Sequence, residues 1–241
     1  MNFKGLKNRI ILGILFLLPV IFLLFLYPST NNYNTLDIVK TDVLEISNFK
    51  SELDDEVKLE GNLTVLGFLG KNSNERALPA LNLKEIIYDK FKGFKKFQVV
   101  ILVPKGSESQ VKLLEKELYQ FDELKYWHFA YGDNEDILNV FKSLNSKIEL
   151  DENLATDHVF IVDKERNQRG RLDDRENKEK EKNRPVLSLY SYDCIEVAIL
   201  KNKMASEDMR VLFTEYRQKR KGDFNTDSRR EQDLKGNNEK I

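Results

Sequence analysis

Apolar blocks separated by polar stretches predict strands and helices that alternate through the middle of the chain. The block at 63–70 predicts a strand, the polar residues after it predict a loop, and Pro79 is typical of the start of a helix. Further strands are predicted at 97–103, 126–131 and 158–163. Apolar residues at helical spacing predict helices over 83–91, 111–121 and 137–144.

This alternation indicates an α/β fold. Strands separated by helices of this length are typical of right-handed βαβ crossovers, which place helices on both faces of a sheet. The run from Phe97 to Val103 is almost continuously apolar, as expected for a strand that is buried on both faces. We therefore expect a largely parallel central sheet flanked by helices.

The pattern changes after Asp163. Residues 164–184 carry many charges of both signs, and the short Gly170-Arg171-Leu172 stretch predicts the returning strand of a hairpin. A terminal helix is predicted with Ser206 as its N-cap. Its apolar stripe consists of Met209, Leu212, Phe213 and Tyr216. Residues 218–241 are rich in charged side chains and asparagine, which predicts a disordered tail.

The N-terminal segment predicts a transmembrane anchor. Residues 10–27 contain no charged side chain, and as a helix they extend about 27 Å, close to the thickness of a hydrocarbon core. Lys4, Lys7 and Arg9 precede them, which places residues 1–9 in the cytoplasm and the rest of the chain outside it. A cleaved signal peptide is the alternative, although residues 28–32 offer no clear cleavage site. Residues 28–58 then predict a linker and an N-terminal hairpin.

Charge and length limit the remaining possibilities. The chain has 241 residues and a formal net charge of −1, so it lacks the basic surface that nucleic-acid binding requires. Residues 59–217 are enough for one domain with a real core. No glycine-rich phosphate loop or Ser-His-Asp motif is evident, and no small-molecule substrate is identifiable.

Two motifs resemble the Sco/SenC family of thioredoxin-like proteins. Leu66-Gly67-Phe68 leads into the loop after the first core strand, and Asp157-His158 opens the fourth. The resemblance covers about residues 59–217. It implies a thioredoxin-like sheet, one N-terminal transmembrane helix, a periplasmic domain and a role in delivering copper to cytochrome oxidase. It also implies that His158 matches the family's copper-ligating histidine.

The chain departs from that family where the chemistry resides. Family members bind copper with two cysteines that lie in the loop, whereas an ungapped placement puts Lys71 and Glu75 at those positions. Neither side chain is a ligand for Cu(I), which prefers soft thiolates. We therefore interpret the loop formed by Gly70, Lys71, Asn72 and Glu75 as a degenerate site, with no cofactor and no enzymatic activity, and His158 as a vestigial metal ligand.

Three functions remain open. The favoured hypothesis is a non-catalytic binding or assembly protein of the bacterial inner membrane that docks an envelope protein during respiratory-oxidase maturation. The second is residual copper or thiol chemistry that uses His158 together with cysteines of a partner. The third is an envelope protein of unrelated role, since a fold does not determine a function. The one cysteine, Cys194, lies in an apolar segment that predicts burial, with an intermolecular disulfide as the alternative.

Overall fold

The computed structural model describes residues 12–22, 35–51, 57–119 and 124–221. The chain divides into two compact units, Met1–Asn34 and Thr35–Ile241. In the first unit, residues 12–22 form a helix. No helix among the described residues has both the length and the apolar character needed to cross a membrane. The other residues of the predicted anchor at 10–27 lie outside the described ones, so the anchor stays a prediction.

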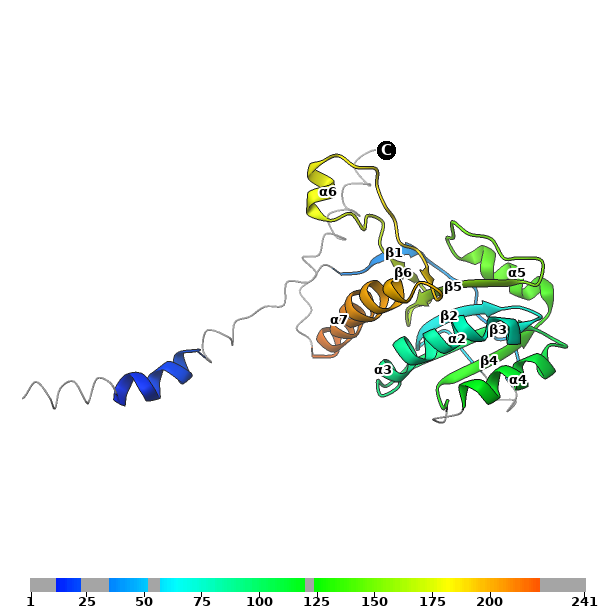
Figure 1. Cartoon of the computed structure of the whole chain (residues 1–241), viewed down its shortest axis with the longest axis horizontal. Coiled ribbons are helices and arrows are strands. Elements are labelled where there is room, and N and C mark those ends of the chain that lie inside the picture. Colours follow the sequence, from blue (N-terminus) through cyan, green and yellow to red (C-terminus); the bar gives the residue numbers. More distant parts are fainter. Residues whose placement is uncertain (1–11, 23–34, 52–56, 120–123, 222–241) are drawn as a thin grey trace, which may run out of the picture. The chain divides into compact units, whose positions relative to one another are not determined.

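The second unit is built on a mixed β-sheet (Figure 1). Its strands are β1 (Asp37–Lys40), β2 (Leu63–Leu69), β3 (Phe97–Pro104), β4 (Trp127–Gly132), β5 (Ala155–Val162) and β6 (Gln168–Gly170). They lie in the order β1-β6-β5-β2-β3-β4, and the short strand β7 (Tyr192–Asp193) also pairs with β5. The α/β class and the sheet with flanking helices are therefore as expected.

The expectation of a largely parallel sheet is wrong for half of it. Strands β2, β3 and β4 run parallel, but β5 is antiparallel to β2, β6 to β5, and β1 to β6. Only the short turn at 163–167 joins β5 to β6, and a parallel pair needs a much longer crossover. Two parallel strands joined through a helix, followed by an antiparallel hairpin on the other side of the first strand, define a thioredoxin-like arrangement.

Helices follow each parallel strand. The first begins as the 3₁₀ turn η1 (Ser73–Arg76) and continues through α2 (Ala77–Leu83), the π-helical η2 (Lys84–Tyr88) and α3 (Asp89–Phe91). The second and third are α4 (Glu108–Leu118) and α5 (Asn134–Ser143). Helical geometry thus starts at Ser73, ahead of Pro79, and half of the predicted polar loop is helical.

The core has two layers, one on each face of the sheet. Along β3, Val99 and Ile101 belong to a cluster with α2, α4 and the C-terminal helix, while Val100 and Leu102 belong to a second cluster with α5. This two-sided burial explains why the sequence of β3 is continuously apolar instead of alternating.

The segment before β2 does not form the predicted hairpin in its described part, residues 35–51. Instead, β1 pairs with β6, and Lys50 forms an isolated bridge with Tyr131 of β4. The segment therefore joins the main sheet and helps to cover its second face, where Val43 and Ile46 are fully buried.

The C-terminal part returns to the sheet after an excursion that carries the short helix α6 (Asn177–Glu181) (Figure 1). One long helix follows, π-helical in η3 (Ile199–Asp208) and regular in α7 (Met209–Lys221). Ser206 lies inside this helix, so its predicted role as N-cap is wrong. Helix α7 also continues to Lys221, past the predicted domain boundary at 217, and residues 222–241 of the predicted tail lie outside the described ones.

Candidate functional site

The loop that the sequence singled out lies at one corner of the sheet, where β2 ends and η1 begins. Gly70 has φ +66°, and a Cβ atom there would lie 2.3 Å from the carbonyl oxygen of Asn153. The next residue, Lys71, donates its backbone N–H to that same oxygen at 2.9 Å. Only glycine fits this close approach, which joins the end of β2 to the loop before β5.

Three of the four predicted degenerate positions face solvent at this corner, and the fourth, Gly70, is buried. Lys71, Asn72 and Glu75 are all exposed. Glu75 donates its backbone N–H to the carbonyl oxygen of Asn72 at 3.0 Å, which closes the first turn of η1. Ser73, which the sequence placed in the exposed loop, is fully buried instead. The corner thus offers an amine, an amide and a carboxylate to a partner, and no thiol.

Sequence reasoning missed Arg76, which links the corner to β5. Its guanidinium hydrogen bonds to the carboxylates of Asp157 and Asp151, the latter at 2.6 Å. Asp151 also accepts the backbone N–H groups of Asn153 at 2.8 Å and Ala155 at 2.9 Å, so it shapes the loop that it anchors. We call Arg76, Asp151 and Asp157 the Arg76 clamp.

The electrostatics of the clamp favour its charged form. Burial alone would lower the pKa of Arg76, but the hydrogen bonds and charges of Asp157 and then Asp151 outweigh burial and raise it. Burial likewise acts to raise the pKa of Asp151, and its backbone hydrogen bonds together with Arg76 overcome that effect and lower it. Arg76 and Asp151 therefore both stay ionised at neutral pH, and the clamp holds the start of the helix against β5.

His158 follows Asp157 in the chain, but its side chain contacts other residues than the Arg76 clamp. Where β2 pairs with β5, Leu66 lies opposite Phe160 and Phe68 lies opposite Thr156. The three residues between these pairs on β5, residues 157–159, therefore form a bulge opposite Gly67 alone. The Nδ1 atom of His158 lies 3.1 Å from the Oγ atom of Ser191, and its Nε2 atom lies 3.9 Å from Asp193 on β7. Among the described residues no group of three His, Cys, Asp or Glu side chains is arranged to hold a metal ion. A ligand role for His158 stays a prediction.

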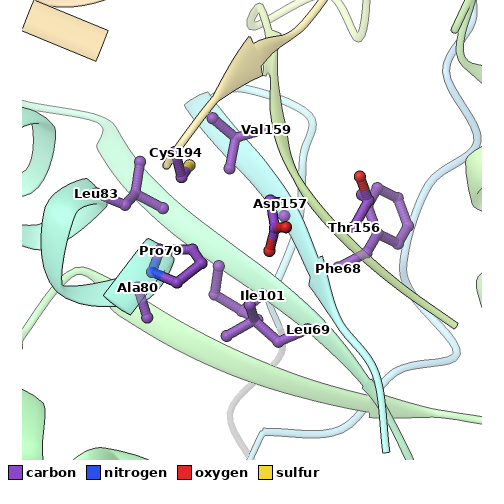
Figure 2. Close-up of a pocket in the computed structure, with 11 residues that line it drawn as sticks. Phe68, Leu69, Pro79, Ala80, Leu83, Ile101, Thr156, Asp157, Val159 and Cys194 are labelled. Atoms are coloured by element: carbon purple, nitrogen blue, oxygen red, sulfur yellow. The ribbon is translucent and has the colours of Figure 1, made fainter. Parts of the chain in front are cut away.

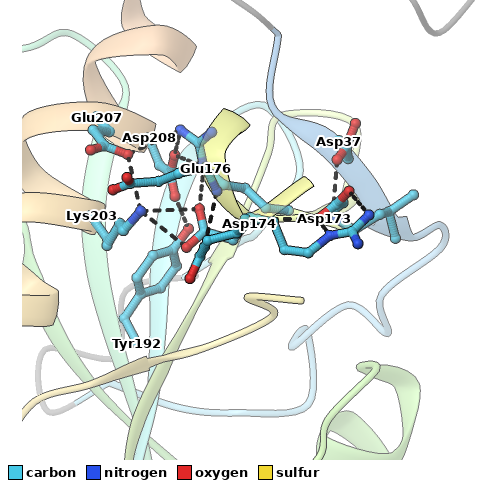
Figure 3. Close-up of polar contacts among 12 residues, drawn as sticks. Asp37, Asp173, Asp174, Glu176, Tyr192, Lys203, Glu207 and Asp208 are labelled. Carbon is cyan, nitrogen blue, oxygen red and sulfur yellow. Dashed lines mark hydrogen bonds and ion pairs between the residues drawn. The ribbon is translucent and has the colours of Figure 1, made fainter. Parts of the chain in front are cut away.

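An apolar pocket lies beneath the corner, between β2, α2 and β5 (Figure 2). Pro79, Ala80 and Leu83 of α2 form one wall, and Asp157 and Val159 of the bulge form another. His158, which lies between these last two residues, does not line it.

Cys194 also lines this pocket, which the sequence did not indicate. Its backbone N–H donates to the carbonyl oxygen of Asp157 at 2.8 Å, so the bulge brings it there. Only 2% of Cys194 is exposed, which confirms its predicted burial. Burial, and then the charges of Asp193 and Asp157, raise the pKa of its thiol far above the ordinary value. Cys194 is thus a protonated, buried side chain rather than a nucleophile.

The strand order and this corner define a thioredoxin-like domain whose corner carries no sulfur. No family model matches the chain, and no curated protein matches it. Solved structures with a similar fold include BsSco, a member of the Sco family of cytochrome c oxidase assembly proteins, at 14% identity over 73% of this chain and 95% of that chain, with a TM-score of 0.46.

Two further solved structures show the same range of similarity. ScoI of Bradyrhizobium japonicum with copper bound is 15% identical over 54% of this chain and 87% of its own, with a TM-score of 0.37. The thioredoxin domain of a thiol-disulfide oxidoreductase from Bacteroides vulgatus is 16% identical over 55% and 86%, with a TM-score of 0.35. Because these TM-scores are below 0.5, we base the fold class on strand order and take no functional assignment from them.

Proposed function

We propose that this chain is a non-catalytic, Sco-like binding protein that recognises a protein partner through its corner. In this proposal the N-terminal segment anchors it in the inner membrane of a bacterium, its domain lies in the periplasm, and its partner takes part in respiratory-oxidase maturation. The Arg76 clamp is the observation that carries the proposal, because it orders the backbone of an exposed, charged corner that has no thiol.

The available side chains argue against thiol exchange. Such exchange needs two thiols, and the chain has a single cysteine, which is buried with a raised pKa. An ungapped placement puts Lys71 and Glu75 near the positions of the family's cysteines, and neither side chain provides a soft ligand for Cu(I). What the corner does provide is a solvent-exposed pair of opposite charges on an ordered backbone, which is suited to recognition.

Complementation of a deletion strain tests the proposal. Membranes of the strain should show less haem a absorbance, and the wild-type gene should restore it. The charge exchange Lys71→Glu with Glu75→Lys should fail to restore absorbance, although both side chains are exposed and the fold should tolerate it. The matched control exchanges Lys116 and Glu117, which are exposed on α4. Full restoration by the corner exchange would contradict docking through this surface, and unchanged absorbance in the deletion strain would remove the link to the oxidase.

Two further variants separate docking from residual chemistry. Cys194→Ala should restore absorbance fully, because the thiol takes no part. His158→Ala should also restore it. If His158→Ala fails while the protein accumulates normally, the alternative of a metal site shared with a partner's cysteines replaces this proposal. Titration of the protein with Cu(I) should show no binding tighter than the micromolar range.

A further inference from the structure

One buried arginine joins the start of the domain to its last helix. Arg169 on β6 is 1% exposed, and its Nη2 atom donates to the carbonyl oxygen of Leu36 at 2.7 Å and to Glu215 of α7, also at 2.7 Å. Lys219, one turn further along α7, contacts the other oxygen of Glu215 at 2.9 Å. The end of α7 therefore lies next to Leu36, where the chain enters the domain.

Cationic and aromatic side chains gather at this place. Tyr216, Lys219 and Arg220 share one side of α7, since residues three and four apart are neighbours on a helix. Lys164, from the turn between β5 and β6, places its Nζ atom 4.4 Å from the centre of the Tyr216 ring, and that of Lys219 lies at 5.6 Å. We call Lys164, Tyr216, Lys219 and Arg220 the entry face.

The charge of the entry face is positive. Lys219 is paired with the buried Glu215, so Lys164 and Arg220 are left with one exposed carboxylate of the entry face among the described residues, Glu165, which accepts a hydrogen bond from the Tyr216 hydroxyl at 3.4 Å. Cations in the last turn of a helix also suit the helix dipole. The helix dipole explains why cations occupy positions 219 and 220, but it does not explain the position of Lys164, which comes from a different part of the chain. A tyrosine between two lysines is a combination that suits the boundary between lipid and water.

We propose that the entry face rests on anionic phospholipid headgroups of the membrane that holds the N-terminal segment. This inference rests on the anchoring in the proposed function. The domain begins at Thr35, a few residues after the predicted anchor ends at 27, and in this proposal the entry face is therefore the side of the domain that meets the bilayer. Lysine and arginine then meet phosphate groups, and Tyr216 lies at headgroup depth. The contact holds the opposite side of the domain toward the periplasm.

Energy transfer from a labelled protein to labelled lipid measures this contact. The full chain is placed in vesicles of phosphatidylcholine alone, or of phosphatidylcholine with phosphatidylglycerol, each with an acceptor dye on the lipid. A donor dye is attached at Arg217→Cys on α7 or at Glu135→Cys on α5, both exposed positions. Figure 1 shows α5 on the far side of the domain from α7. Transfer from position 217 should rise when phosphatidylglycerol is present and fall again with added salt, while transfer from position 135 should not.

Charge-reversal variants provide the second part of the vesicle experiment. Lys164→Glu with Arg220→Glu should abolish the phosphatidylglycerol-dependent rise, and it leaves the ion pair of Lys219 with Glu215 intact. The control, Lys112→Glu with Lys116→Glu on α4, makes the same change in net charge at exposed positions and should keep the rise.

The outcomes separate this inference from the anchor itself. If the chain stays with the vesicles on flotation in high salt, but energy transfer from position 217 does not change with phosphatidylglycerol, the inference about the entry face is wrong and the anchor is still supported. A chain that does not float with vesicles overturns both. An equal loss in the control would assign the effect to net charge and overturn the entry face as well.

Discussion

Replacing Gly70 with alanine tests whether the corner is built as described. The change adds one methyl group at a residue with φ +66°, where the Cβ atom would lie 2.3 Å from the carbonyl oxygen of Asn153 and 2.8 Å from the Cβ atom of Ala155. Gly61 provides the matched control, because it has a similar φ of +77° but nothing within 4 Å of the added Cβ atom. The pair therefore separates backbone strain from collision.

The expected magnitudes differ accordingly. A left-handed conformation costs an alanine about 1–2 kcal/mol, of which about 0.4–1 kcal/mol is offset by the stiffer unfolded chain. Gly61→Ala should thus lower the free energy of unfolding by about 1 kcal/mol. Gly70→Ala carries the same strain, and its collision with backbone adds about 1–3 kcal/mol because a carbonyl group cannot rotate away as a flexible side chain does. Its total should be about 2–4 kcal/mol.

Urea denaturation followed by tryptophan fluorescence measures both variants. The chain has one tryptophan, Trp127, which is 5% exposed on β4, so its emission reports the folding of the sheet. Equal losses of stability in Gly61→Ala and Gly70→Ala would refute the close approach of the corner to the loop before β5.

Three further predictions concern charges and the thiol. Arg76→Met should lower the free energy of unfolding by about 1–3 kcal/mol at neutral pH, since two partly exposed carboxylates lose charged hydrogen bonds. The folded pKa of Asp151 is depressed, so its share of that stability is present above the unfolded pKa near 3.9 and is lost as pH falls through the folded value. The stability difference between Arg76→Met and the wild type should therefore shrink in acid. Urea titrations at several pH values measure it, and a difference that stays constant would speak against the clamp. Cys194 in the folded protein should react with iodoacetamide far more slowly than in urea, and equal rates by mass spectrometry would contradict its burial. Arg169→Met should cost about 3–5 kcal/mol, because it leaves the buried Asp163 without its cation and Glu215 with Lys219 alone, and a thermal melt that hardly moves would exclude that network.

The parts of the fold that the sequence predicts are those with strong periodicity. Strands β2, β3 and β4 and the helices between them follow directly from apolar spacing, because each must bury one or both faces. Strand direction does not follow from spacing. The pairing of β6 with β5 agrees with the hairpin predicted after Asp163, although β6 lies at Gln168–Gly170 instead of 170–172, whereas the antiparallel placement of β5 against β2 has no signal in the apolar pattern. The continuation of η3 into α7 through Ser206 depends on packing, which overrides a capping signal.

The candidate site was located by its loop but not by its contacts. Gly70 and its neighbours lie at the corner as expected, whereas the partner of that corner is Arg76, an unremarkable charged residue in the sequence. Its importance comes from Asp151 and Asp157, which lie more than seventy positions away. Such a pairing gives no signal in the hydrophobic pattern of the sequence. The position of Cys194 beside the pocket gives none either, because it results from the bulge in β5.

The construction of the corner favours recognition over exchange. Thiol exchange needs an accessible thiolate, and the loop at the corner carries no cysteine. Here the corresponding loop is tied down by a glycine that fits closely against Asn153 and by a guanidinium held between two carboxylates. These contacts order the backbone that carries the exposed Lys71 and Glu75, and a surface whose backbone is ordered in advance loses less free energy on binding. If the corner docks a protein partner as proposed, its ordered backbone increases the affinity that it can offer to that partner.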